Sequence, residues 1–124
     1  MNILLDQEIR YKLLKLLSSK GNLSQREMAS HLGISLGKIN GFISDLAQRG
    51  FILVRQTRGS GKRMKYLYLL TSEGLEEKAG LAMNFLKTRI SDYEKIRKQI
   101  RELFDEVSEA EVPSGGKPQG LKEL

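Results

Sequence analysis

The chain has 124 residues, enough for one compact domain and little more, with no cysteine and a single histidine. Disulfides and thiolate metal sites are excluded, and no apolar run approaches the roughly 18 residues of a membrane-spanning helix. The N-terminal segment is apolar only at intervals, and no cleavage site of small residues follows it. We therefore expect no signal peptide, no membrane association and a cytoplasmic location.

Charge is divided unevenly along the chain. Residues 1–71 carry twelve Lys and Arg against four Asp and Glu, a net charge of +8. Residues 72–124 carry nine against eleven, a net charge of −2. A basic part beside a near-neutral part indicates contact with a polyanion, although many small domains are simply basic.

Three helices are predicted in the first fifty residues. The first, over 6–19, begins with Asp6 as its cap, and Gly21 is expected to end it in a left-handed conformation. Its expected buried face consists of Ile9, Leu13, Leu16 and Leu17. The second begins at Ser24, which forms a capping box with Glu27. It ends at Gly33, close after the partly exposed His31.

The third helix, over about 35–49, begins at a Ser35 cap and ends at Gly50. Its expected buried stripe is Leu36, Ile39, Ile43 and Leu46, with Phe42 beside it. The opposite face is small or polar, and consists of Gly37, Lys38, Asn40, Gly41, Ser44 and Gln48.

Two strands follow, over 51–57 and 65–71, joined by a basic, glycine-rich tip that is too long for a two-residue turn. The tip carries Arg58, Lys62 and Arg63. We assign the aromatic side chains to the core or the sheet rather than to base stacking, and these are Phe42, Phe51, Tyr66 and Tyr68.

A long helix is predicted over 72–107, capped by Thr71 or Ser72. With Ser72 at heptad position a, nine of the eleven a and d residues are apolar, a pattern typical of a coiled coil. The expected dimer interface is Leu75, Ala79, Ala82, Leu86, Tyr93, Ile96, Ile100, Leu103 and Val107. Residues 108–124 contain both prolines and are expected to be a disordered tail.

The element order predicts a mainly α, winged helix-turn-helix fold with a two-stranded wing and a long C-terminal coiled-coil helix. The expected domains are the DNA-binding unit 1–71, the dimerisation helix 72–107 and the tail 108–124. A helix that enters the major groove needs a narrow leading end with donors and acceptors. Gly37 and Gly41 suit that approach, at a helix-propensity cost of about 1 kcal/mol each. The alternative is that they pack against another helix.

The candidate DNA-binding residues divide by chemistry. Asn40 is suited to adenine, and Lys38 to guanine or phosphate. Gln25 and Arg26, at the start of the second helix, are candidates to hold a phosphate, with a solvated surface charge as the equal alternative for Arg26. The full set is Gln25, Arg26, Ser35, Gly37, Lys38, Asn40, Ser44, Gln48, Arg58, Lys62 and Arg63.

The stretch from Leu23 to Ile52, LSQREMASHLGISLGKINGFISDLAQRGFI, resembles the helix-turn-helix of MarR-type regulators. Residues 66–78, YLYLLTSEGLEEK, resemble that family's second wing strand and dimerisation helix. These motifs are also similar to a short MarR-like subgroup associated with bacterial exopolysaccharide genes. The resemblance implies a dimer on a pseudo-palindromic operator, with bases near Ser35, Gly37, Lys38 and Asn40 and with the wing arginines and lysine on DNA.

The chain departs from that family in starting almost directly at the first helix of the DNA-binding unit and ending with one long helix. The family's ligand pocket is therefore not carried over, and a small-molecule effector stays open. We expect a homodimeric, sequence-specific transcriptional regulator that binds double-stranded DNA, with exopolysaccharide genes as candidate targets. The alternative is a winged-helix interaction module whose long helix binds another protein. No catalytic set, metal site or cofactor motif is present, so an enzyme is not expected.

Overall fold

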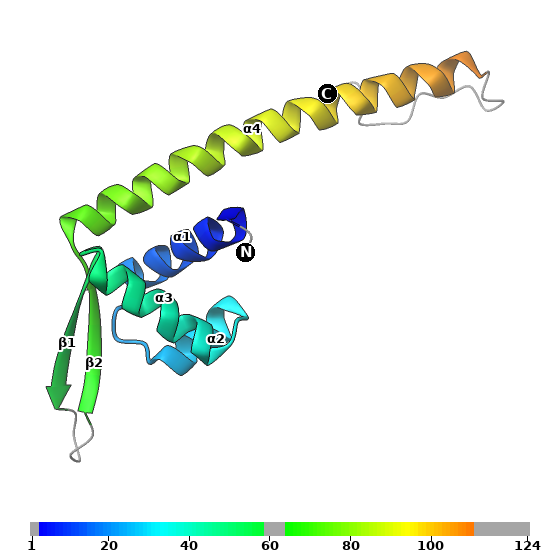
Figure 1. Ribbon diagram of the computed structural model, residues 1–124. Helices are drawn as coiled ribbons and strands as arrows, with labels where there is room; N and C mark the ends of the chain where they lie inside the picture. Colours follow the sequence, from blue (N-terminus) through cyan, green and yellow to red (C-terminus); the bar gives the residue numbers. More distant parts are fainter. Residues whose placement is uncertain (1–2, 59–63, 111–124) are drawn as a thin grey trace. The chain divides into compact units, whose positions relative to one another are not determined.

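The computed structural model describes residues 3–58 and 64–110. These form α1 (Ile3–Ser19), α2 (Gln25–Leu32), α3 (Leu36–Gln48), β1 (Ile52–Arg58), β2 (Met64–Leu70) and α4 (Ser72–Glu109) (Figure 1). The chain divides into two units, Met1–Met83 and Asn84–Leu124. The first unit therefore includes about three turns of α4. The predicted fold class, a mainly helical winged helix-turn-helix with a two-stranded wing and a long C-terminal helix, is confirmed.

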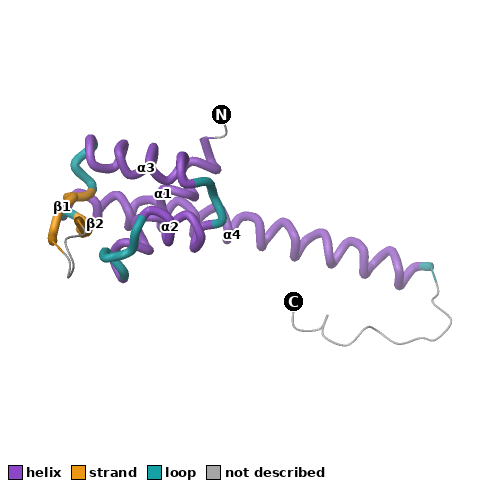
Figure 2. Tube along the Cα trace, turned by 90° about the horizontal axis from the view of Figure 1, so that it is seen from below, coloured by secondary structure: helices purple, strands orange, loops and turns teal. Residues whose placement is uncertain are grey.

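The core of the first unit lies between α1, α2 and α3, which group together beside the hairpin (Figure 2). Leu14 is fully buried, whereas the predicted core residue Leu16 is only half-buried. The apolar face of α1 is thus turned slightly from the predicted one. The fully buried large side chains are Leu13, Leu14, Met28, Ile39 and Leu46.

Two predictions about the ends of α1 are wrong. The helix already begins at Ile3, so Asp6 lies in its first turn and is not its cap. Gly21 does not adopt a left-handed conformation, which among the described glycines occurs at Gly33 and Gly50. Gly21 is instead needed for close approach, because a Cβ there would collide with the carbonyl oxygen of Tyr68. Its own carbonyl oxygen accepts a 2.9 Å hydrogen bond from the Tyr68 N–H.

The predicted capping box of α2 is confirmed. Ser24 Oγ accepts the Glu27 N–H at 3.1 Å, and the Ser24 N–H donates to Glu27 Oε1 at 3.2 Å. These hydrogen bonds to its carboxylate hold the pKa of Glu27 below its ordinary value. Gly33, at φ 67°, ends the helix in the left-handed conformation that glycine adopts without strain.

The cap of α3 is also as predicted, with Ser35 Oγ accepting the Lys38 N–H at 3.2 Å. Ile39, Ile43 and Leu46 are buried, but Leu36 is 40% exposed. As the first residue of α3, Leu36 lies at the margin of the core, where the other helices no longer cover it. Its assignment to the buried stripe is therefore wrong.

The strands pair antiparallel from Ile52 opposite Leu70 to Arg58 opposite Met64, shifted by one residue from the predicted ranges. The sheet is joined tightly to α4. Thr71 Oγ1 donates to the Gly50 carbonyl oxygen at 2.5 Å and accepts the Gly74 N–H at 3.0 Å, which makes Thr71 the cap of α4. Hydrogen bonds at this helix start lower the pKa of Glu73.

In the second unit, α4 leaves most of its predicted a and d side chains exposed. Leu86, Tyr93, Ile96, Leu103 and Val107 are exposed, and Ile100 is half-buried. The helix ends at Glu109, so residues 108 and 109 are helical and not part of a tail. The expected disorder of 111–124 lies outside the described residues. No helix in the described ranges is both long and apolar enough to cross a membrane.

Candidate nucleic-acid interface

The candidate reading surface is the outer face of α3. At 100° per residue, Gly37, Asn40, Gly41, Ser44 and Gln48 fall on one side of this helix, opposite its three buried residues. All five are exposed. The structure therefore gathers the predicted α3 residues on one open face, with exposed Lys38 at its edge.

The two glycines of α3 have no packing partner. A Cβ added to Gly37 or to Gly41 would meet no heavy atom within 4 Å. Neither glycine has a positive φ. Among the described residues there is therefore no conformational or packing reason for a helix of 13 residues to carry two glycines. This argues against the alternative that they pack against another helix of this chain.

The candidate cations are open to solvent. Arg26, Lys38 and Arg58 are exposed, and no carboxylate within the described ranges forms an ion pair with any of them. Unpaired guanidinium and ammonium groups remain available to an external anion such as a phosphate. Lys62 and Arg63, the other predicted wing residues, lie outside the described residues.

Two predicted contact residues have roles inside the protein. The Ser35 hydroxyl is used as the cap of α3. Gln25 bridges two elements: its Oε1 accepts from Asn40 Nδ2 at 3.2 Å, and its Nε2 donates to the Tyr68 hydroxyl at 3.3 Å. Tyr68 is 4% exposed, as expected for a residue of the core or the sheet. Its hydroxyl contact with Gln25 was not predicted from the sequence.

The face of the wing that carries Tyr68 is set by strand register. Gln56 and Arg58 lie on this face with Tyr66, because alternate residues of a strand share one side. The Tyr66 and Tyr68 rings stack at 6.4 Å, and Gln56 Nε2 donates to the Tyr66 hydroxyl at 3.2 Å. Tyr66 itself is 44% exposed, so it belongs to the sheet surface and not to the core.

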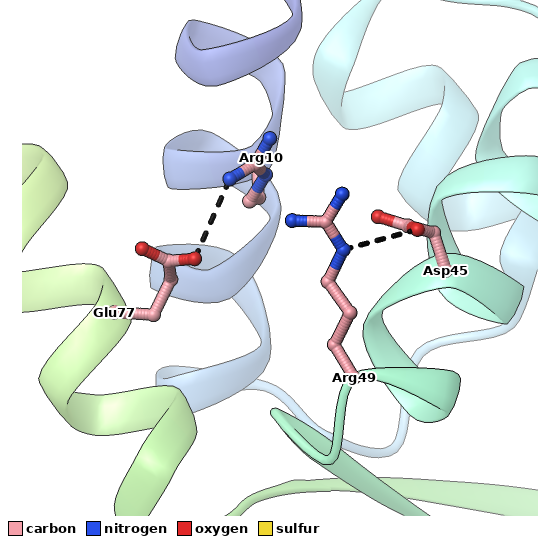
Figure 3. Close-up of polar contacts among 4 residues, drawn as sticks. All are labelled: Arg10, Asp45, Arg49 and Glu77. Atoms are coloured by element: carbon pink, nitrogen blue, oxygen red, sulfur yellow. Dashed lines mark hydrogen bonds and ion pairs between the residues drawn. The ribbon is translucent and has the colours of Figure 1, made fainter.

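Two ion pairs involve arginines at the start of the chain and at the end of α3. Arg10 Nη1 lies 3.4 Å from Glu77 Oε2 and joins α1 to α4, with side chains only 17% and 24% exposed. Arg49 Nε lies 3.2 Å from Asp45 Oδ1 within α3. In Figure 3 the two arginine side chains point to different partners, Arg10 to Glu77 on α4 and Arg49 to Asp45 on α3. They line an open pocket of about 580 Å³ that also borders Gly41, so α1 leaves that side of α3 uncovered.

No group of three or more metal-ligating His, Cys, Asp or Glu side chains occurs in the part of the chain that the structure describes. What the geometry does provide is a capped helix-turn-helix, an open polar helix face and an adjoining two-stranded wing. This arrangement defines the class: a winged helix-turn-helix protein.

Comparison with known proteins agrees with that class. Residues 6–52 are similar to a family described as winged helix-turn-helix DNA-binding. No curated protein matches the chain.

Several solved structures share the fold, among them a MarR-family regulator. The PcaV transcriptional regulator from Streptomyces coelicolor is 22% identical, with 81% of this chain and 78% of that chain covered and a TM-score of 0.54. A MarR-family regulator from Rhodococcus sp. RHA1 is 19% identical, with coverage of 82% and 71% and a TM-score of 0.56. A mutant of S. aureus MepR bound to an oligodeoxyribonucleotide is 14% identical, with coverage of 83% and 78% and a TM-score of 0.55. At these identities the likeness is one of fold.

Proposed function

We propose that the protein is a homodimeric transcriptional regulator that binds a specific double-stranded DNA sequence through α3 and the wing. The observation that carries this proposal is the outer face of α3, where two glycines without any packing partner flank the exposed Asn40. A narrow helix surface that carries an exposed amide fits the floor of the major groove.

Within this proposal the exposed residues have separate tasks. Asn40 reads a base, and Lys38 contacts guanine or phosphate from the edge of α3. Ser44 and Gln48 lie one and two turns further along and face the DNA backbone. Arg26, in the first turn of α2, and the wing cations bind phosphates on either side of the groove.

The proposed dimer forms when a second copy covers the apolar stripe of α4. Support comes from the exposure of its a and d side chains, since an unburied apolar row of this length is unfavourable in water. The two copies would then present α3 helices about one DNA turn apart, roughly 34 Å, or a multiple of that. An inverted repeat is the matching operator.

The target genes follow only from the motif resemblance. We propose genes of exopolysaccharide synthesis, because the SQRE and YLYLLT motifs are similar to those of the regulators associated with such genes. If the target genes prove to be different, the proposed DNA binding is not affected.

Selection of genomic DNA fragments by the purified protein tests the proposal. The salt concentration should be near physiological, because bare phosphate attraction weakens steeply as salt rises. We expect enrichment of an inverted repeat, and a footprint that the Lys38→Ala/Asn40→Ala double variant loses while it stays folded. Binding without sequence preference, or an unchanged footprint in that variant, would overturn the assignment.

The dimer is tested by the mass in solution at micromolar concentration. Ile96→Asp places a charge on the apolar stripe and should convert the dimer to monomer. Ser91→Asp introduces the same residue at the exposed heptad position f and should leave the dimer intact. A wild-type chain that is monomeric would favour the alternative, an interaction module whose long helix pairs with a different protein.

A further inference from the structure

Three elements of the DNA-binding unit are joined by one chain of hydrogen bonds. The Tyr68 hydroxyl on β2 accepts from the Gln25 amide on α2, and the Gln25 oxygen accepts from the Asn40 amide on α3, at 3.3 and 3.2 Å. We name these three groups the amide relay. Gln25 and Tyr68 are 43 positions apart, so only the fold brings them together.

The inner end of the relay is fixed by burial. The Tyr68 side chain is 4% exposed, and its N–H is hydrogen-bonded to the Gly21 carbonyl oxygen at 2.9 Å. Gln25 is the first residue of α2, immediately after the Ser24 cap. Both supports are therefore held by backbone contacts, whereas Asn40 is exposed at the outer end.

The relay determines which atoms Asn40 offers to the outside. Its Nδ2 carries two hydrogens, and one of them is committed to Gln25 Oε1. The free groups are the Oδ1 acceptor and one N–H donor. An adenine edge in the major groove presents the complementary pair, the N6 donor and the N7 acceptor.

A free amide would turn about its last torsion and exchange the places of oxygen and nitrogen. In the observed orientation Asn40 Oδ1 cannot face Gln25 Oε1, because two acceptors would meet. The Tyr68 hydroxyl holds the Gln25 amide in place, but since a hydroxyl both donates and accepts, it does not choose which Gln25 atom faces inward. We propose that Gln25 and Tyr68 are positioning residues that hold the Asn40 amide in the plane in which its oxygen and nitrogen meet an adenine edge.

This inference rests on the proposed function, and it gives Gln25 a role different from the predicted phosphate contact. Phosphate contacts change affinity for all sequences, whereas a positioning residue changes the preference at one base pair of each half-site. That difference can be measured. The readout is the ratio of affinities for the selected operator and for the same operator substituted at a single position.

Tyr68→Phe removes the hydroxyl and keeps the ring. We expect this variant and Gln25→Leu to lower the ratio at one adenine about 3- to 10-fold, the range of a net hydrogen bond. Affinity for unrelated DNA and its salt dependence should stay unchanged. Tyr66→Phe is the matched control, because that hydroxyl lies outside the relay and accepts from Gln56.

Gln25→Glu provides a rescue. A carboxylate oxygen still accepts from Asn40, and the Tyr68 hydroxyl can turn to donate to the other oxygen. The base preference should therefore survive, while the added negative charge lowers affinity for every sequence alike. In the Asn40→Ala background, Tyr68→Phe should have no further effect on the ratio, because the two changes remove the same interaction.

The outcomes separate this inference from the proposed function. If wild type selects an operator and both Tyr68→Phe and Gln25→Leu keep the full preference at every position, the relay has no part in reading and the inference fails alone. If wild type selects no sequence, both fail. Thermal unfolding shows whether each variant is folded. If Tyr68→Phe does not fold, the affinity ratio of Gln25→Leu tests the inference.

Discussion

Adding one methyl group to α3 separates the two explanations for its glycines. In Gly41→Ala the new Cβ has no heavy atom within 4 Å, and position 41 lies inside the helix with an ordinary negative φ. Alanine is about 1 kcal/mol more favourable than glycine in a helix interior. The DNA-free variant should therefore be more stable than wild type by up to about 1 kcal/mol, or a few degrees in Tm.

The same methyl group should weaken DNA binding. If α3 lies in the major groove with Gly41 against the duplex, the Cβ must push the helix outward. Forcing a methyl group into a closely packed contact costs about 1–3 kcal/mol, which corresponds to roughly 5- to 150-fold in Kd. A change that stabilises the free protein and weakens the complex cannot be explained by damage to the fold.

Gly80→Ala is the matched control for this experiment. Gly80 is also helical and exposed, its added Cβ would meet nothing within 4 Å, and its heptad position b lies away from the proposed dimer stripe. It should be stabilised similarly and bind DNA as wild type does. Urea unfolding and titration of the selected operator measure both quantities. If Gly41→Ala binds that operator with unchanged affinity, the outer face of α3 is not the reading surface.

Three further predictions concern a close backbone contact and two helix caps. Gly74→Ala should lower the free energy of unfolding by about 1–3 kcal/mol, because its Cβ would collide with the Phe51 carbonyl oxygen; stability equal to that of Gly80→Ala would contradict this. Thr71→Val removes the cap of α4 and should cost about 0.5–2 kcal/mol in the same urea assay. The pKa of Glu27 is lower in the folded chain than its ordinary value of 4.5. The ionised carboxylate therefore stabilises the folded state above pH 4.5, and this stabilisation is lost as the pH falls through the pKa of the folded state. Glu27→Gln should therefore lose less stability than wild type as the pH falls below 4.5, and parallel pH curves would refute that reasoning.

The sequence predicts local features of this fold better than its tertiary contacts. Ser24 and Ser35 were identifiable as caps because the physical demand, an acceptor for free N–H groups, is met by neighbours in sequence. Leu36 was misplaced because a periodic pattern does not tell where the covering helices end. Gly21 was misread for a similar reason, since its close contact is with β2, distant in sequence.

The candidate site shows the same division. The polar face of α3 follows from helical periodicity alone, and its residues were predicted together. The part played by Tyr68 was not predictable, because tyrosine in a strand is ordinarily a packing residue. Its hydroxyl reaches Gln25 only because β2 lies against the start of α2. Gly21 and the strand register determine that position.

The polar groups of this surface differ in how firmly they are held, and the difference matches what each is proposed to recognise. Arg26, Lys38 and Arg58 have no ion-pair partner among the described residues, and a phosphate imposes little angular demand on a mobile cation. A base edge demands that donor and acceptor arrive in one plane, so a side chain that reads it gains from being oriented in advance. Asn40 is the residue of the α3 face whose side chain the structure ties to a second element, which is why it, rather than Ser44 or Gln48, is where sequence preference should be concentrated.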